Sequence, residues 1–335
     1  MGKSLKRLSG RTTVACAVLG LLIAASVVLY IYSRTYAKSA RIGIAMTSAA
    51  FDSIIARAMP ALVGMVAAAI LIAVLSLLFQ TMTQSRILTP SMIGFDSVFV
   101  GTQTLLVFVF GSASKVFSNP YLNYLITAGA MILVSMLMYS AVLRKSRNNM
   151  VFLLMFGLVL SGVVRNGARY LQVIMTETDF NQVQAATNVT VNNMNTGIIL
   201  LVLPIMACLL VVIMLRHRTY NVMCLGEDNA KSLGVNYSRE INTGLILISV
   251  GMSIATALIG SLTFLGLLAV NIARELLKTH KHLPLFIISA GIAALTLIAG
   301  QAVVELLQGA VPVTAVIDLV GCSYMFRLIL KENRI

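Results

Sequence analysis

Long apolar segments recur along the whole chain, and they constrain its fold more than any other feature. An α-helix needs roughly 20 consecutive apolar residues to cross the hydrocarbon core of a bilayer. Short polar connections separate segments of this kind from the N-terminus to the C-terminus. They predict an all-α, polytopic membrane protein with about ten transmembrane helices, which we place at residues 13–32, 59–79, 91–112, 121–143, 150–172, 196–215, 241–259, 262–273, 284–305 and 312–330.

The segment at 262–273 is shorter than the others and has Gly260 and Gly266 close by. We expect a half-helix or a re-entrant piece, which is tolerated where protein buries its backbone ends. When this segment is counted, the number of spans is even and both termini lie on one side of the membrane. Most of the 25 lysines and arginines then lie on that side. The positive-inside rule therefore places both termini in the cytoplasm.

The scarcity of charge supports a membrane protein and argues against a soluble one. Charged residues make up 11% of the chain, whereas soluble domains carry about 25%. The net charge of +14 does not indicate nucleic-acid binding, because the basic residues are not gathered on a soluble domain. The apolar run that follows the basic N-terminus is long for a signal-peptide core, so we interpret it as a retained first span. We expect one transmembrane domain over residues 1–335.

The cysteines and histidines do not predict a metal centre or a disulfide framework. No two cysteines form a C-x-x-C pair, and the only histidines are His217, His280 and His282, in basic loops. Three of the cysteines lie in apolar stretches, where cysteine behaves as a small buried hydrophobe. The four cysteines are Cys16, Cys208, Cys224 and Cys322.

A charged segment between two apolar spans, residues 216–240, is longer than a simple turn requires. Its centre predicts a short helix, because acidic residues stand at the start, where the helix dipole favours them, and Gly234 is placed to end it. Ala230 and Leu233 are three residues apart and would share one face of that helix. A small apolar face outside the membrane suggests a docking site for a soluble partner.

Two connections on the other side of the membrane are also long. The first, 33–58, is polar and charged, and the second, about 173–195, is rich in amide side chains and has no basic residue. The second is either a solvated loop or an outer vestibule whose neutral donors and acceptors meet a large polar solute. The candidate residues for such a pathway are Gln182, Gln184, Asn192, Asn193 and Asn195.

The sequence contains no pattern that predicts catalysis or nucleotide binding. It has no G-x-x-x-x-G-K-[ST], H-E-x-x-H or G-x-S-x-G motif. The acidic residues nearest membrane depth are Asp96, Glu305 and Asp318, and intramembrane carboxylates are functional candidates by default. These three lie near predicted span ends and do not form a convincing proton relay. The chain therefore has no predicted catalytic or metal-binding residue, and it would move a solute while a partner supplies energy.

Several motifs, in the same order over about 270 residues, resemble the FecCD-type permeases of ABC importers for ferric siderophores, haem and cobalamin. Residues 225–234 match the pattern Leu-Gly-x-x-x-Ala-x-x-Leu-Gly, and residues 264–274 are similar to Phe-Val-Gly-Leu followed by Ile-Ala-Arg. Residues 80–96, with Arg-Ile-Leu-Thr-Pro and Gly-Phe-Asp, resemble the branch that handles catecholate-type ferric siderophores, as do residues 192–196. Pro312, Val313 and Gly321 resemble the last span of the family.

The resemblance implies a transmembrane permease of a bacterial cytoplasmic membrane that imports a ferric siderophore. Its expected partners are two cytoplasmic ABC ATPases, a second permease subunit of the same or a related kind, and an extracytoplasmic substrate-binding protein. The chain itself would bind no cofactor, since ATP and magnesium belong to the ATPase and iron travels as a chelate. In the family, the loop matching 216–240 carries the coupling helix, which assigns that role here to Leu225, Gly226, Glu227, Ala230, Leu233 and Gly234.

The chain departs from the family pattern on its outer side. The second span of the family begins Arg-x-Pro-Arg, whose arginines can pair with the binding protein, whereas here Ala58 and Ala61 hold those places. Arg57 is one residue away and is the candidate for docking. Further departures are Val270, Asn271, Gly300 and Glu305.

Three alternatives remain open from the sequence. The cargo of such a permease could be haem or cobalamin. A self-sufficient secondary carrier or channel would show inverted repeats and an intramembrane charge relay, neither of which is evident. An intramembrane enzyme would need a catalytic constellation.

Overall fold

The predicted apolar segments are all helical. The computed structural model of the chain describes residues 2–42, 48–146, 150–188, 195–307 and 310–332, and this part contains no β-strand. The all-α prediction is confirmed. The helices that cover most of the predicted spans are α1 (Gly2–Ile42), α2 (Ser48–Met82), α3 (Phe95–Phe110), α5 (Pro120–Ser146), α6 (Met150–Ile174), α8 (Thr196–Leu215), α11 (Tyr237–Ile259), α12 (Leu265–Leu277), α13 (His282–Leu306) and α14 (Val313–Glu332).

Seven helices in the described ranges are long and apolar enough to cross a membrane: α1, α2, α5, α6, α8, α11 and α13. Helices α3 and α12 are shorter, with 16 and 13 residues, and α14 is not among the seven. A multi-pass membrane protein is therefore confirmed, while the count of ten spans stays a prediction.

The expected connections contain more helix than their sequences suggested. Helix α1 continues to Ile42 and α2 begins at Ser48, so most of the first long connection is helical. In the second, α7 (Glu177–Thr187) forms because the side chain of Thr176 caps it by accepting a hydrogen bond from the backbone N–H of Asp179. The remaining short helices are η1 (Pro90–Ile93), α4 (Lys115–Ser118), α9 (His217–Met223) and α10 (Glu227–Ser232).

Helix α2 forms the centre of the molecule and packs against α8, α11, α12 and α13. Small residues let these helices approach closely, as is common in membranes. A Cβ atom added at Gly251 of α11 would lie 2.6 Å from Cδ1 of Leu75, and one at Gly266 of α12 would lie 2.0 Å from Oγ of Ser76. The core is therefore specified by steric fit around α2.

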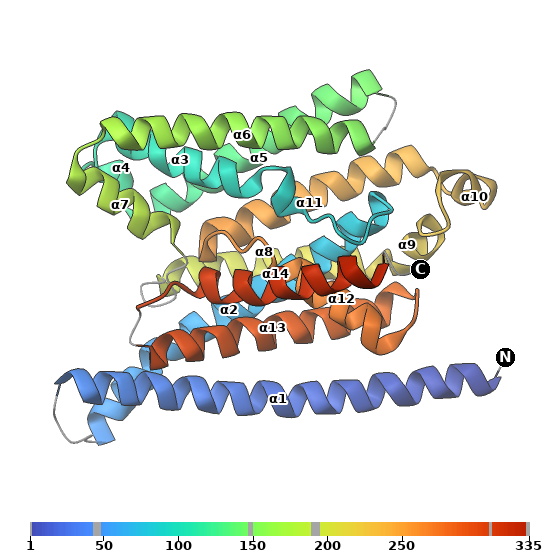
Figure 1. Cartoon of the computed structure of the whole chain (residues 1–335), viewed down its shortest axis with the longest axis horizontal. Helices are drawn as coiled ribbons and strands as arrows, with labels where there is room; N and C mark the ends of the chain where they lie inside the picture. The colour runs from blue at the N-terminus through green and yellow to red at the C-terminus, as the bar shows by residue number, and fades with distance from the viewer. Residues whose placement is uncertain (1, 43–47, 147–149, 189–194, 308–309, 333–335) are drawn as a thin grey trace.

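The two ends of the helix bundle carry different elements (Figure 1). Helices α9 and α10, the first turns of α1 and the last turns of α14 lie at one end, and α4 and α7 lie at the other. The described ends of the chain, Gly2 and Glu332, thus lie on the same side as the charged segment 216–240, as the sequence predicted. The positive-inside rule predicts that this is the cytoplasmic end, and we refer to it by that name.

Candidate functional site

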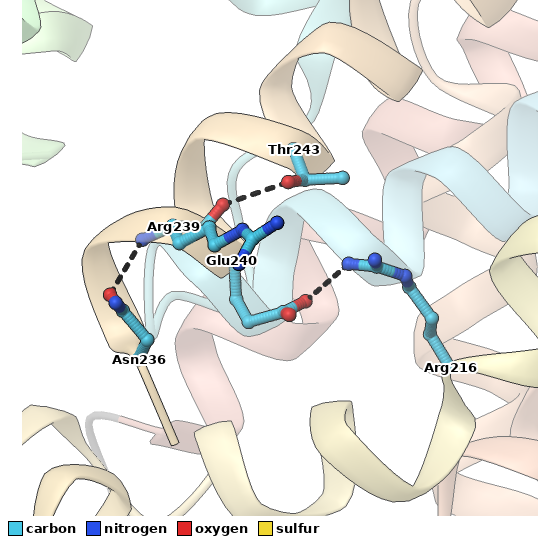
Figure 2. A network of polar contacts seen from close by, with 5 residues as sticks. All are labelled: Arg216, Asn236, Arg239, Glu240 and Thr243. Carbon is cyan, nitrogen blue, oxygen red and sulfur yellow. Dashed lines mark hydrogen bonds and ion pairs between the residues drawn. The ribbon is translucent and has the colours of Figure 1, made fainter.

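The candidate site is the connection between α8 and α11 at the cytoplasmic end, residues 216–240. An ion pair joins the two ends of this connection: Nη1 of Arg216 lies 2.8 Å from Oε2 of Glu240 (Figure 2). Arg216 caps the C-terminus of α8 and Glu240 lies in the first turn of α11. The pair therefore holds the ends of two spans together where the connection leaves them.

The start of α11 is fixed by local hydrogen bonds beside this ion pair (Figure 2). The backbone N–H of Arg239 donates to Oδ1 of Asn236 over 3.2 Å, which makes Asn236 the N-cap. Oγ1 of Thr243 donates to the carbonyl oxygen of Arg239 over 2.9 Å. These bonds set where the connection ends and the span begins.

Helix α10 begins after Gly226, whose backbone conformation residues other than glycine rarely adopt. Gly226 has φ +94° and ψ 168°, a conformation that a side chain strains. Glu227 and Asp228 occupy the first turn, and Oε1 of Glu227 lies 2.7 Å from Nζ of Lys231 one turn later. This bond raises the pKa of Lys231 above its ordinary value. The predicted helix with an acidic start is confirmed.

The C-terminus of α10 closes with a Schellman motif. The backbone N–H of Val235 donates to the carbonyl oxygen of Ala230 over 3.0 Å, and that of Gly234 donates to the carbonyl oxygen of Lys231 over 2.9 Å. Gly234 has φ +84°, the left-handed conformation that this motif requires. The prediction that Gly234 ends the helix is confirmed.

The apolar residues of the segment point in opposite directions. Ala230 is fully buried and belongs to the same core cluster as Met223 and Tyr237. Leu225 and Leu233 are 56% and 62% exposed. The prediction that Ala230 and Leu233 share an exposed face is wrong, because α10 rests on α9 and α11 through Ala230. The exposed apolar residues available to a partner are the two leucines that flank the helix.

Helix α9 connects α10 to the two central spans through His282. Oδ1 of Asn221 accepts a hydrogen bond from the backbone N–H of His282 over 2.8 Å and lies 2.9 Å from its Nδ1. Because an amide oxygen can only accept, Nδ1 carries the proton. Nε2 lies 2.8 Å from Oγ1 of Thr81 on α2. One imidazole thus joins α9, α13 and α2.

A second bond holds α9 against the end of α2. Nε2 of Gln84 donates to the carbonyl oxygen of Met223 over 2.9 Å. The sequence analysis placed His282 in a basic loop and missed this role. Its position three residues before Leu285, which is buried in α13, was the one signal that could have placed it at a span start.

Three of the outer candidate residues, Gln182, Gln184 and Asn195, lie in the part of the chain that the structure describes. Gln182 and Gln184 are exposed on either side of the buried Val183 of α7. Asn195 caps α8 by accepting a hydrogen bond from the backbone N–H of Gly197 over 2.9 Å. Asn192 and Asn193 lie outside the described residues, as does the side chain of Arg57, whose backbone is part of α2.

Asp96 is one of the three intramembrane carboxylates, and its two oxygens have different surroundings. Oδ2 of Asp96 accepts a hydrogen bond from Oγ1 of Thr263 over 2.6 Å, and its other oxygen is buried without a partner in the described part of the chain. In the same part, no cluster of three or more histidine, cysteine, aspartate or glutamate side chains could hold a metal ion.

Comparisons with known proteins give one consistent family. The model of the FecCD transport family matches residues 18–331. The chain is 36% identical over 264 residues to the petrobactin import system permease protein YclO of Bacillus subtilis, covering 78% of this chain and 84% of that protein. It is 27% identical over 287 residues to the permease protein FatC of the petrobactin import system of Bacillus anthracis, covering 85% and 81%.

A solved structure has the same fold. It is described as an inward-facing conformation of a putative metal-chelate type ABC transporter. The TM-score is 0.74 at 19% sequence identity, and the match covers 96% of this chain and 99% of the other.

Proposed function

The chain belongs to the FecCD transport family and is the permease subunit of an ABC importer, and from this premise we propose that its cargo is a ferric siderophore of the catecholate type. Two relatives that are named as permeases of petrobactin import systems support this cargo. The residues 80–96 that resemble the catecholate branch support it independently. Iron would enter as part of the chelate, so the permease needs no metal ligand of its own.

The family implies a partner ATPase and a substrate-binding protein. We infer the finer arrangement: two ATPases below, a second permease subunit beside this chain, and a binding protein above, in the cytoplasmic membrane of a bacterium. The observation that carries the proposal is the geometry of α10, a capped helix at the cytoplasmic end with Leu225 and Leu233 exposed on its flanks. These leucines would insert into a groove of the ATPase.

The bonds of α9 suggest how ATP would act on the spans. When the ATPases close on ATP, each would displace α10, and the displacement would reach α2 and α13 through Asn221 and His282. ATP can shift the permease between conformations only by as much as the ATPase contact differs between them. Gly226, Glu227, Ala230 and Gly234 would maintain the shape of α10, and the leucines would make the contact.

The test is reconstitution of the permease with its ATPase, binding protein and radiolabelled ferric siderophore in proteoliposomes. We expect Leu233→Asp to abolish ATP-dependent uptake, because a carboxylate would be buried in the ATPase groove. Leu233→Met keeps size and polarity and should import normally. Uptake by the Asp variant at the wild-type rate would contradict the coupling role, and a wild-type complex that imports haem or cobalamin instead would contradict the cargo.

Arg57 is our proposed docking residue for the binding protein, since it stands one place from a family arginine. Arg57→Glu should weaken the binding protein's affinity for the reconstituted transporter. Unchanged affinity would mean that another surface or the second permease subunit provides the docking charge.

A further inference from the structure

Two arginines lie on the surface of a span, where an arginine needs an explanation. Arg165 and Arg169 are one turn apart on α6, and both are exposed. The surface around them is apolar: Leu158, seven residues before Arg165, is 58% exposed, and Val173, four residues after Arg169, is 83% exposed. Neither arginine forms an ion pair with a carboxylate in the described part of the chain.

The depth of Arg165 makes contact with lipid unfavourable. It lies nine residues before Ile174, the last residue of α6, which places its Cα atom about 13 Å from the outer end of the helix. Charged side chains at such depth nearly always face protein or a water-filled cavity. The flank of α6 that carries the arginines therefore faces one of these in the assembled transporter.

The orientation of α6 is fixed by its contact with α3, which borders the flank of the arginines, so the arginines cannot rotate away. Oγ of Ser161 lies 2.6 Å from Oγ of Ser97, and Nε2 of Gln172 donates to Oγ1 of Thr104 over 2.9 Å. Both bonds join α6 to α3. A Cβ atom added at Gly157 would lie 2.2 Å from Cγ2 of Ile93, so the contact is also sterically close.

One buried carboxylate interacts with Arg165 but does not account for its position. The charge of Arg165 acts on Asp96, but Asp96 forms its hydrogen bond with Thr263. Asp96 is 5% exposed whereas Arg165 is exposed. The guanidinium groups of Arg165 and Arg169 are thus available to an anion outside the chain.

We propose that Arg165 and Arg169 form an anion-binding stripe that contacts a negatively charged ferric chelate during its passage. This inference rests on the proposed function. Each guanidinium has five N–H donors in a rigid fork that suits carboxylate and catecholate oxygens. The stripe would lie at the pathway between this chain and the second permease subunit, and it would favour anionic chelates over uncharged ones.

The first experiment asks whether the stripe faces water. Arg165→Cys and Val159→Cys are introduced into a variant whose four native cysteines are alanine and which still imports. Val159 is 67% exposed on the apolar surface of the same helix. In proteoliposomes, the anionic reagent sulfonatoethyl methanethiosulfonate should modify Arg165→Cys and leave Val159→Cys unmodified. Equal reactivity of the two cysteines, or reactivity of Val159→Cys alone, would overturn the proposal.

The second experiment measures uptake. Arg165→Gln removes a charge-assisted hydrogen bond to the cargo and should slow import of an anionic ferric siderophore by about tenfold. The double Gln variant, with Arg165→Gln and Arg169→Gln together, should import more slowly still. Arg165→Lys keeps the positive charge and should recover import. Arg327 is an exposed arginine of α14, and Arg327→Gln is the matched control. Import at the wild-type rate by the double Gln variant would overturn the proposal.

Two further outcomes separate this inference from its alternatives. If Arg165 acted only through its charge on Asp96, then Asp96→Asn would slow import as much as Arg165→Gln. Combining Asp96→Asn with Arg165→Gln would then slow import no further, and this result would overturn the proposed stripe. If the wild-type complex imports no ferric siderophore, the proposed cargo fails. Selective modification of Arg165→Cys would in that case still support a stripe that faces water and binds another anion.

Discussion

The cytoplasmic and outer ends of this permease are built on different principles. At the cytoplasmic end, the connection that carries α9 and α10 is joined to three spans by bonds between residues far apart in sequence: Arg216 to Glu240, Gln84 to Met223, and Asn221 to His282. At the outer end, the described bonds of α7 are more local: Thr176 caps it, and the backbone N–H of Ser112, just after α3, donates to Asp179. The first end is suited to transmit a displacement, and the second to adapt to one.

This difference matches what each end must contact. An ATPase presents the same surface in every cycle, so a rigid coupling segment loses little of the displacement it receives. A binding protein and a bulky chelate arrive and leave, so an outer helix with few tertiary bonds can rearrange at small cost.

Ala230→Trp should have the largest effect, because Ala230 is fully buried between α10 and the core. Overpacking at this site should cost ~3 kcal/mol or more of local stability, displace α10 and abolish uptake-linked ATP hydrolysis. The measurement is ATPase activity stimulated by the loaded binding protein in proteoliposomes. The exposed Ala185 of α7 provides the control, since Ala185→Trp should leave that activity intact. Normal ATP hydrolysis in Ala230→Trp would contradict a rigid coupling segment.

Asn221→Leu should have the next largest effect. It leaves the backbone N–H and the Nδ1–H of His282 without an acceptor, at a cost of about 3 kcal/mol for two buried donors. We expect ATP hydrolysis to continue while uptake falls, so that more ATP is consumed per chelate imported. If α9 transmits the displacement through His282, then Asn221→Leu and His282→Leu together should cost less than the sum of the single variants. Additive losses would indicate two independent contacts.

The sequence predicted the helical fold well because bilayer physics leaves few choices for a chain with this hydropathy. It also predicted the start and end of α10, since acidic first turns and C-terminal glycines act locally. It did not predict the burial of Ala230 or the role of His282. Both depend on which helices lie next to α9 and α10, and no spacing within 216–240 contains that information. Helix α7 was missed because its amide-rich composition resembles that of a loop, and the Thr176 cap that starts it is a weak signal alone.

Gly226→Val should have a moderate effect, because its positive φ would be kept at a cost of about 2 kcal/mol. The strain would loosen the start of α10 and lower coupling efficiency while leaving the membrane-spanning part folded. Gly129 of α5 is the matched control, because it has no positive φ and nothing lies within 4 Å of an added Cβ atom. Gly129→Ala should import normally. A Gly226→Val variant with wild-type coupling would show that α10 tolerates a different entry angle.

Asp179 should show the smallest effect, and it is the point where the outer end responds to pH. Hydrogen bonds from Ser112 and Thr176 hold the pKa of this exposed carboxyl below its ordinary value. A depressed pKa in the folded state means that the bonds to Asp179 stabilise α7 fully above the ordinary range of aspartate, and that this contribution is lost as pH falls through the folded pKa. Amide hydrogen exchange in α7 should therefore accelerate at acidic pH in the wild type. In Asp179→Asn it should already be fast at neutral pH and depend on pH only through intrinsic exchange chemistry. Because α10 lies at the opposite end of the bundle and makes its own ion pair, from Glu227 to Lys231, Asp179→Asn should leave exchange in α10 as it is in the wild type at every pH. Faster exchange in both α7 and α10 of this variant would remove the distinction between the two ends.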